Sequence, residues 1–214
     1  MMEIDVILLA AGTSSRMGQP KALLSWQGGT LLEHACAPFA NLSGEKIAVL
    51  GQNLEARAGL VEPYGFKAII NKQAQKGQSE SLRVGLAALS RESRPLFCAV
   101  VDQPLLTAHI VEQIGRTYES LVTAYGFTKH ASFDTKRLIL CPRYGAHKRR
   151  GNPVLFGPYW RPFLATLEGD QGGRAILYGK GSEYIEFIDF AVSAGVDVDT
   201  PDDYINLYNM WGSK

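Results

Sequence analysis

Short apolar runs alternate with longer amphipathic segments along most of this 214-residue chain. Four runs rich in Val, Ile and Leu predict buried strands at 6–9, 46–50, 68–70 and 96–101. Between these runs, apolar residues recur at helical spacing over 55–62 and 79–90. Such alternation predicts parallel strands joined by helical crossovers, and hence an α/β fold: a three-layer α/β/α sandwich with a Rossmann-like, mostly parallel sheet.

The second half of the chain has a looser pattern. A helix is predicted from 107 to about 121, followed by a polar, aromatic and irregular excursion over 123–137. Further strands are predicted at 138–141, 154–156 and 184–187, and further helices at 159–167, 173–178 and 203–211. We expect this half to form a wall over the carboxyl edge of the sheet, where such folds bind ligands.

Composition excludes several classes of protein. The chain has 22 Lys and Arg against 21 Asp and Glu, so its charge favours neither nucleic acid nor an anionic membrane as a partner. No window approaches the roughly 18 apolar residues of a membrane span, and the N-terminal apolar run lacks the basic flank of a signal peptide. Cys36, Cys98 and Cys141 lie far apart among apolar neighbours. We therefore expect buried free thiols in a cytoplasmic protein.

The loop after the first predicted strand is suited to a triphosphate. Residues 8–21 read Leu-Leu-Ala-Ala-Gly-Thr-Ser-Ser-Arg-Met-Gly-Gln-Pro-Lys. Small residues leave backbone N–H groups open to anions, and Arg16 and Lys21 add full positive charges. Neither the Walker A order nor the dinucleotide-binding Gly-x-Gly-x-x-Gly is present. The alternative is a glycine-rich turn that carries no chemistry.

An aspartate follows the central predicted strand. Asp102 lies at the end of the run 96–101, and Pro104 ends the extended segment. A carboxylate there points to the ligand-binding edge, where Mg²⁺ would bridge it to phosphate oxygens. The alternative is an aspartate that caps the next helix. Together with the phosphate loop, the metal role is favoured.

The loop resembles the Leu-Ala-Ala-Gly-x-Ser-x-Arg-Met-Gly-x-x-Lys motif of GT-A-like nucleotidyltransferases, and within that group the molybdenum cofactor cytidylyltransferase family. Its fixed positions are Leu9, Ala10, Ala11, Gly12, Ser14, Arg16, Met17, Gly18 and Lys21. The resemblance implies a Mg²⁺-dependent transfer from CTP to a molybdopterin-type cofactor, with release of pyrophosphate. It also allows a transient contact with a molybdoenzyme.

The resemblance assigns roles residue by residue. Catalysis falls to Arg16, Lys21 and Asp102, and the metal to Asp102 with Asp199 of the string Asp197-Val-Asp-Thr-Pro. The same 200–203 segment is also a good helix start, with Thr200 as cap and Pro201 first. Nucleotide contacts are expected from Leu9, Ala10, Ala11, Gly12, Ser14, Arg16, Lys21, Gln78, Ser79 and Ser81. For Ser79 the alternative is a helix N-cap.

Acceptor binding is implied for two downstream segments. Arg150 and Asn152 lie in a run similar to the family's Arg-Gly-His/Asn-Pro-Val, and a basic loop suits an acceptor that carries a phosphate. Asp170 and Arg174 lie in a run similar to Gly-Asp-x-Gly-Ala-Arg, which departs at Gly173. A solvated charged turn and a plain loop are the respective alternatives.

We thus expect one domain over 1–214, with a nucleotide-binding half at 1–107 and an acceptor half at 108–214. The choice of CTP over GTP depends on Ala11, because guanylyl-transferring relatives usually carry Leu-Ala-Gly-Gly. Two alternatives remain open. One is a GTP-using or sugar- or polyol-phosphate nucleotidyltransferase of the same fold, and the other is a carrier that binds finished cofactor without catalysis.

Overall fold

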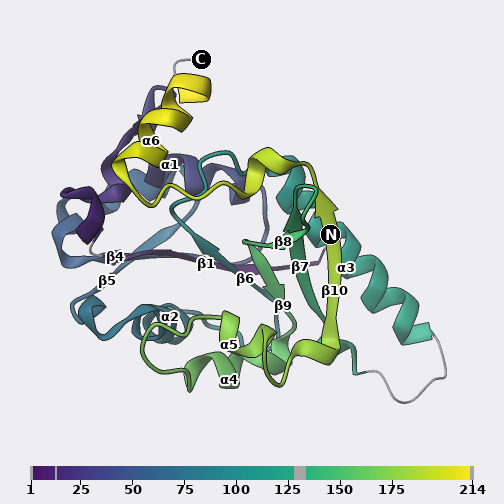
Figure 1. The fold of residues 1–214 in the computed structure, drawn as a ribbon. Coiled ribbons are helices and arrows are strands. Elements are labelled where there is room, and N and C mark those ends of the chain that lie inside the picture. The colour runs from purple at the N-terminus through teal and green to yellow at the C-terminus, as the bar shows by residue number, and fades with distance from the viewer. Residues whose placement is uncertain (1, 13, 128–133, 213–214) are drawn as a thin grey trace.

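The computed structural model describes residues 2–12, 14–127 and 134–212. Its centre is an eight-stranded sheet with helices on both faces, which confirms the predicted α/β layers (Figure 1). The strand order is β10-β7-β9-β6-β1-β4-β5, with β8 paired to β7. These strands are β1 (Asp5–Ala10), β4 (Lys46–Gly51), β5 (Lys67–Asn71), β6 (Leu96–Val100), β7 (Ile139–Tyr144), β8 (Arg149–Arg150), β9 (Val154–Phe156) and β10 (Ile185–Phe190).

The sheet is mostly parallel, as predicted, and β9 is its main exception. Strands β6, β1, β4 and β5 pair in parallel, and so do β7 and β10. Strand β9 pairs antiparallel with both β6 and β7, so it joins the two parallel portions into one sheet. A separate hairpin is formed by β2 (Ser25–Trp26) and β3 (Gly29–Thr30).

Helices cover both faces of the sheet (Figure 1). The α-helices are α1 (Leu31–Cys36), α2 (Gln78–Ala87), α3 (Ala108–Phe127), α4 (Arg161–Ala165), α5 (Arg174–Leu177) and α6 (Pro201–Leu207). A longer 3₁₀ segment spans Gln52–Tyr64. Short 3₁₀ segments lie at Ser15–Met17, Lys21–Leu23, Ala37–Phe39, Ala74–Lys76, Thr135–Arg137, Pro158–Trp160, Ser182–Tyr184 and Val192–Gly195, and a π-helical turn at Tyr208–Gly212.

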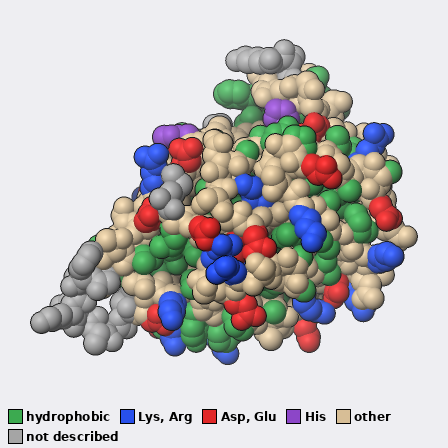
Figure 2. Space-filling view, turned by 180° about the vertical axis from the view of Figure 1, so that it is seen from behind, with side chains coloured by type: hydrophobic (Ala, Val, Ile, Leu, Met, Phe, Trp, Pro, Cys, Tyr) green, Lys and Arg blue, Asp and Glu red, His purple; other side chains and the backbone are tan. Residues whose placement is uncertain are grey.

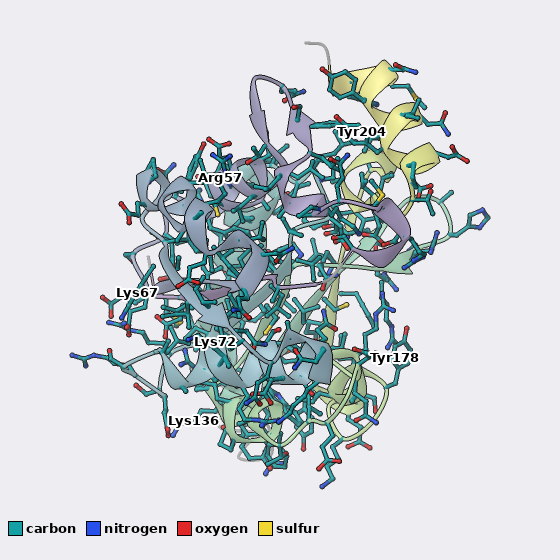
Figure 3. The ribbon with its side chains drawn as sticks, turned by 90° about the vertical axis from the view of Figure 1, so that its left-hand side faces the viewer. Arg57, Lys67, Lys72, Lys136, Tyr178 and Tyr204 are labelled. Atoms are coloured by element: carbon teal, nitrogen blue, oxygen red, sulfur yellow. The ribbon has the colours of Figure 1, made fainter. Side chains whose placement is uncertain are left out.

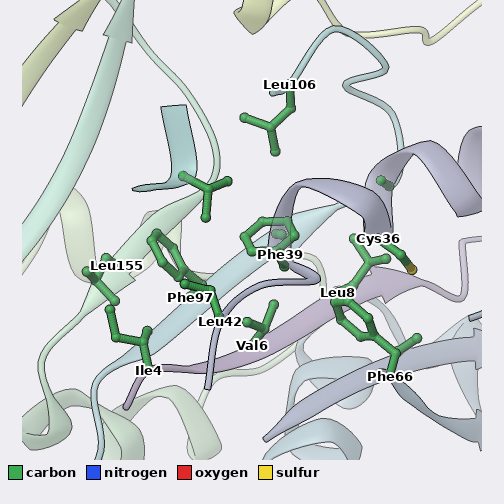
Figure 4. Close-up of a cluster of buried hydrophobic side chains, with 14 of the residues drawn as sticks. Ile4, Val6, Leu8, Cys36, Phe39, Leu42, Phe66, Phe97, Leu106 and Leu155 are labelled. Carbon is green, nitrogen blue, oxygen red and sulfur yellow. The ribbon is translucent and has the colours of Figure 1, made fainter. Parts of the chain in front are cut away.

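The period of two along the strands divides the core into two layers. Val6 and Leu8 of β1 point to the layer that holds α1 and α3, whereas Ile7 packs with α2 and α4 on the opposite face. The first layer is shown in Figure 4, where the rings of Phe39 and Phe97 are in edge-to-face contact. Because both faces of the sheet are covered, the central strands are apolar over most of their length, apart from Asp5 at the start of β1 and Lys46 at the start of β4.

Two predicted elements differ from the structure. The segment predicted as an α-helix at 55–62 is a 3₁₀ helix within Gln52–Tyr64, which contains Pro63. The predicted excursion at 123–137 is wrong for its first part, because α3 continues to Phe127. Leu121 and Val122 still pack on the first core layer and extend the helical period. Residues 128–133 of that prediction lie outside the described residues.

A buried ion pair ties the start of β1 to α4. Asp5 is fully buried and accepts a hydrogen bond of 2.6 Å from Arg161 Nη2. The same guanidinium donates to the carbonyl oxygens of Arg94 and Arg91 at 2.8 and 2.7 Å. Asp5 Oδ1 also accepts from the Glu45 N–H at 2.9 Å. The charges are thus fully hydrogen-bonded, as burial of an ion pair requires.

Surface and cysteine positions agree with the sequence. Acidic and basic side chains are interspersed on the face shown in Figure 2, without a broad area of one sign. Cys36, Cys98 and Cys141 are buried and free, and burial raises the pKa of Cys141 to about 11. No helix in the described parts of the chain combines the length and apolar character needed to cross a membrane.

Candidate active site

Two adjoining cavities lie at the carboxyl ends of β1 and β6. The first, of about 480 Å³, is bordered by the loop after β1 and the start of α2. The second, of about 550 Å³, is bordered by β8, β9 and α5. Asp102 and Asp199 line both cavities. The two carboxylates therefore lie where the occupants of the cavities would meet.

The loop after β1 folds over the first cavity. Ala10 and Ala11 are buried, and Ser14 adopts a left-handed conformation with φ 51°. Its hydroxyl oxygen accepts a hydrogen bond of 2.9 Å from the Lys21 N–H, which closes the loop. Arg16 is 69% exposed at its side chain. The predicted nucleotide-binding residues that line this cavity are Leu9, Ala10, Ala11, Gly12, Ser14, Arg16, Lys21, Gln78 and Ser81.

Lys21 joins the two aspartates. Its Nζ lies 3.3 Å from Asp102 Oδ2 and 3.0 Å from Asp199 Oδ1. Burial raises the pKa of Asp102, and the nearby Lys21 ammonium opposes that shift. The sequence placed Lys21 on phosphates. In the structure its charge is instead neutralised by the predicted metal ligands.

Asp199 reaches Asp102 because the chain around Val198 docks on the end of β6. Val198 N donates to Asp102 O at 2.8 Å, and its side chain is fully buried with Trp26 and Leu31. Asp197, on the other side, accepts from Gln103 Nε2 at 2.8 Å. The contact of Gln103 with Asp197 was not predicted, although the position of Gln103 next to Asp102 was a signal for a role in the site.

The start of α6 fixes Asp199 from behind. Thr200 caps the helix and Pro201 is its first residue, which confirms the predicted helix start. Asp203 accepts hydrogen bonds from the Thr200 N–H at 2.8 Å and from the Asp199 N–H at 3.2 Å. The segment therefore contains both the helix cap at Thr200 and the carboxylate of Asp199. Its interpretation as a helix start is compatible with its interpretation as a source of a metal carboxylate.

The start of α2 is held by the loop at 169–170. The Ser79 N–H donates to Gly169 O at 3.0 Å, and the Gln78 N–H donates to Asp170 Oδ1 at 3.2 Å. Gly77 precedes the helix with φ +104°, and a Cβ there would lie 2.5 Å from Gly169 O. Asp170 thus fills the role of helix cap and borders both cavities.

The structure does not bring Ser79 to either cavity. Its side chain is buried, and the first residue before α2 is Gly77, with no side-chain cap. Ser79 is thus absent from the lining of both cavities, and the residue at the N-cap position is Gly77 rather than Ser79, the alternative considered for it. Ser81, one turn away from the helix start, does line the first cavity and accepts a hydrogen bond of 3.0 Å from Asn71.

The second cavity gathers the predicted acceptor residues. Arg150, Asn152, Asp170 and Arg174 all line it, together with Arg149, for which no separate role was predicted. Arg150 Nη1 donates to Leu177 O at 3.3 Å. Within 2–12, 14–127 and 134–212, no carboxylate pairs with Arg149, Arg150 or Arg174. The cavity therefore presents three guanidinium groups to an anionic ligand, in a wall that also contains the carboxylates of Asp102, Asp170, Asp197 and Asp199.

The carboxylate pair fits a divalent cation. Asp102 and Asp199 converge on one cationic atom, Lys21 Nζ, which shows that both can face a single positive centre. The described parts of the chain contain no group of three or more His, Cys, Asp or Glu side chains that could hold a metal. Two carboxylates with phosphate oxygens and water are a sufficient set for Mg²⁺.

Comparisons with known proteins agree with this geometry. Residues 6–184 match the family model of the MobA-like NTP transferase domain. The chain is 34% identical to the nicotine blue oxidoreductase of Paenarthrobacter nicotinovorans over 94% of each chain. It is 27% identical to the molybdenum cofactor cytidylyltransferase of Escherichia coli K12, over 96% of this chain and 95% of the relative.

Solved structures share the whole fold. The Rv0371c protein of Mycobacterium tuberculosis H37Rv matches with a TM-score of 0.74 and 26% identity, over 97% of this chain and 98% of that one. The same protein in complex with manganese matches with a TM-score of 0.72 and 25% identity, over 97% and 98% of the two chains.

Proposed function

We propose, from the premise that this chain belongs to the MobA-like NTP transferase family, that it transfers CMP from CTP to the terminal phosphate of a molybdopterin-type cofactor and releases pyrophosphate. The observation that carries the proposal is the position of Asp102 and Asp199 in the walls of both cavities. A nucleotide in the first cavity and a phosphorylated acceptor in the second would meet at these carboxylates.

The first cavity supplies what a nucleoside triphosphate needs. Backbone N–H groups of the small residues after β1 would face the phosphates, and Arg16 lies exposed at the cavity wall. Lys21 would neutralise the charge that develops on pyrophosphate. The choice of CTP is supported by Ala11 and by the cytidylyltransferase of E. coli. A guanylyltransferase of Xanthomonas euvesicatoria, 28% identical over 70% of this chain, supports GTP as the alternative.

The second cavity supplies what an acceptor phosphate needs. Arg149, Arg150 and Arg174 would bind the phosphate and orient one oxygen toward the α-phosphate of the nucleotide. A phosphate monoester has its second pKa at about 6, so it is largely dianionic near neutral pH and needs no general base. Catalysis then consists of positioning and charge neutralisation.

A divalent cation, Mg²⁺ in our proposal, would be held by Asp102 and Asp199 and would supply Lewis-acid stabilisation of phosphate oxygens. These two carboxylates are bound to Lys21 in the structure. Lys21 contacts one oxygen of each carboxylate, so the other oxygen of each would remain for the cation, and the Lys21 ammonium would lie beside the phosphates that the cation neutralises.

Incubation with each of the four nucleoside triphosphates separately tests the proposal. The purified protein receives Mg²⁺ and molybdopterin, and pyrophosphate is measured. We expect release with CTP, and no release when Asp102→Asn replaces the native protein. Release with GTP alone would contradict the choice of nucleotide, and release with a sugar or polyol phosphate would contradict the choice of acceptor. Tight binding of finished cofactor without turnover would favour a carrier.

An oxidoreductase activity is the second candidate, and the observation that favours it is the 34% identity to the Paenarthrobacter enzyme over nearly the whole chain. The phosphate loop and the adjoining cavity could also hold a dinucleotide cofactor, which would supply hydride. The test measures oxidation of NADH and NADPH with planar heterocyclic acceptors. Oxidation without any pyrophosphate release from CTP would favour this candidate over nucleotidyl transfer.

A further inference from the structure

Tyr178 is an exposed aromatic side chain at the wall of the second cavity. It is 71% exposed, although large apolar side chains are mostly buried in this protein. It directly follows α5 and lines the cavity that contains Arg150 and Arg174. Figure 3 shows it at the outer edge of the layer that contains α5. So exposed a ring contributes little to the core, and binding of a ligand would bury it.

The position of the ring is braced by Arg150. The guanidinium carbon of Arg150 lies 4.8 Å from the centroid of Tyr178 and 5.1 Å from that of Phe187. The hydrogen bond from Arg150 to Leu177 O fixes the same guanidinium to the residue before Tyr178. A cation between two rings limits the motion of the exposed one. Tyr178 is therefore a positioned aromatic surface.

Guanidinium groups and an aromatic surface thus lie in one cavity. Arg149 and Arg174 line it without carboxylate partners among the residues that the structure describes. A ligand that satisfies both features carries a phosphate and a planar heteroaromatic ring. We infer that Tyr178 is the stacking surface for the ring of the acceptor and so selects planar heteroaromatic monophosphates over aliphatic phosphates. This inference depends on the proposed function, which places the acceptor in the second cavity.

Equilibrium binding of two probes tests this inference. The first probe is 6-hydroxymethylpterin monophosphate, followed by its own fluorescence, and the second is methyl phosphate, a competitor without a ring. We compare the native protein with Tyr178→Leu, which keeps apolar surface but removes the aromatic face, and with Tyr178→Phe, which keeps the ring. Because Tyr178 is exposed, both variants should have the same unfolding temperature as the native protein.

We expect Tyr178→Leu to raise the dissociation constant of the pterin phosphate about tenfold, the scale of base–aromatic stacking. Tyr178→Phe should bind it as the native protein does, and methyl phosphate should compete equally in all three. The dissociation constant of CTP should not change, because Tyr178 does not line the first cavity. Equal losses for both probes, or no loss in Tyr178→Leu, would overturn the inference.

Pyrophosphate release separates this inference from the proposed function. If the pterin phosphate binds with the expected dependence on Tyr178 but CTP yields no pyrophosphate with molybdopterin, the aromatic site stands and nucleotidyl transfer fails. If pyrophosphate is released at rates and acceptor KM values that do not depend on Tyr178, nucleotidyl transfer stands and the aromatic site fails.

Discussion

The N–H of Val198 donates a hydrogen bond of 2.8 Å to the carbonyl oxygen of Asp102. This bond joins a segment near the C-terminus to the end of β6 in the first half of the chain. Asp199 directly follows Val198 in the chain. The same contact therefore brings the carboxylates of Asp199 and Asp102 to Lys21. The candidate site is therefore complete only when both halves of the chain are in place.

Replacing Asp102 should remove activity without loss of fold. Asp102→Asn is expected to lower kcat at least about 10²-fold, the scale of losing one electrostatic stabiliser. Because burial raises the pKa of Asp102, its ionised form destabilises the folded state above that pKa. The unfolding temperature of the variant near neutral pH should therefore equal or exceed that of the native protein.

Asp197→Asn is the matched control for Asp102→Asn. Asp197 is exposed, lines only the second cavity and still allows a hydrogen bond from Gln103 when replaced by Asn. Its kcat should stay within a few-fold of native in the pyrophosphate assay. Equal losses of kcat in the two variants would contradict a specific role for Asp102 in catalysis.

The cap of α6 should matter to stability and to metal binding. Thr200→Ala is expected to lower the free energy of unfolding by about 1 kcal/mol, the usual effect of losing a cap, and to weaken Mn²⁺ binding through Asp199. Urea unfolding and calorimetric titration with Mn²⁺ measure the two effects. Thr200→Ser keeps the hydroxyl and should restore both. Unchanged Mn²⁺ affinity in Thr200→Ala would contradict the link between the cap and Asp199.

The same cap makes a pH-dependent contribution. The hydrogen bond with the Thr200 side chain, together with backbone N–H donors, lowers the pKa of Asp203 in the folded state. A lowered pKa stabilises the fold above the unfolded value, about 3.9, and that stability is lost as pH falls through the folded value. The stability difference between native protein and Asp203→Asn should thus shrink below about pH 4. A difference that stays constant down to pH 2 would contradict this assignment.

Gly77 should not tolerate a side chain. Gly77→Ala places a Cβ at φ +104° and 2.5 Å from Gly169 O, so we expect a loss of about 2–4 kcal/mol from strain and overpacking. Gly59→Ala is the control, because no atom lies within 4 Å of a Cβ there. Chemical denaturation should show a shift for Gly77→Ala alone. Equal stability of both variants would mean that the backbone at 169–170 can move away from the new Cβ at little cost in free energy.

The buried ion pair of Arg161 should contribute more to stability than an exposed ion pair does. Arg161→Met removes the 2.6 Å partner of the buried Asp5, which then keeps the longer 3.5 Å contact with Arg94, and is expected to cost about 3 kcal/mol of unfolding free energy. The double variant with Asp5→Asn should recover part of this loss. Arg116→Met, which removes an exposed pair with Glu112, should change stability by less than about 0.5 kcal/mol. Denaturant unfolding of all three compares them directly.

The strands were predictable because the sheet is buried on both faces. Val6 to Leu9 belong to a continuous apolar run, and in α/β folds such a short run is typical of a strand buried on both faces. The full length of α3 was not predicted, because residues 121–125 are half-buried or exposed and show no clear helical spacing of apolar side chains. The antiparallel pairing of β9 depends on contacts distant in sequence, which no local pattern records.

Site residues divide in the same way. The loop after β1 could be located because a local string of small and basic residues has a direct use in binding phosphate. The partnership of Lys21 with Asp102 and Asp199 could not, because it follows from docking of Val198. Arg149 and Tyr178 were also missed, since a surface charge or ring has no period that marks it as facing a cavity.

The position of Asp170 links the two cavities. It borders both cavities and at the same time holds the first N–H group of α2. An occupant that shifts this loop in one compartment therefore alters the rim of the other, so the two substrates should bind with linked affinities. Thermodynamic reciprocity then requires that each changes the dissociation constant of the other by the same factor.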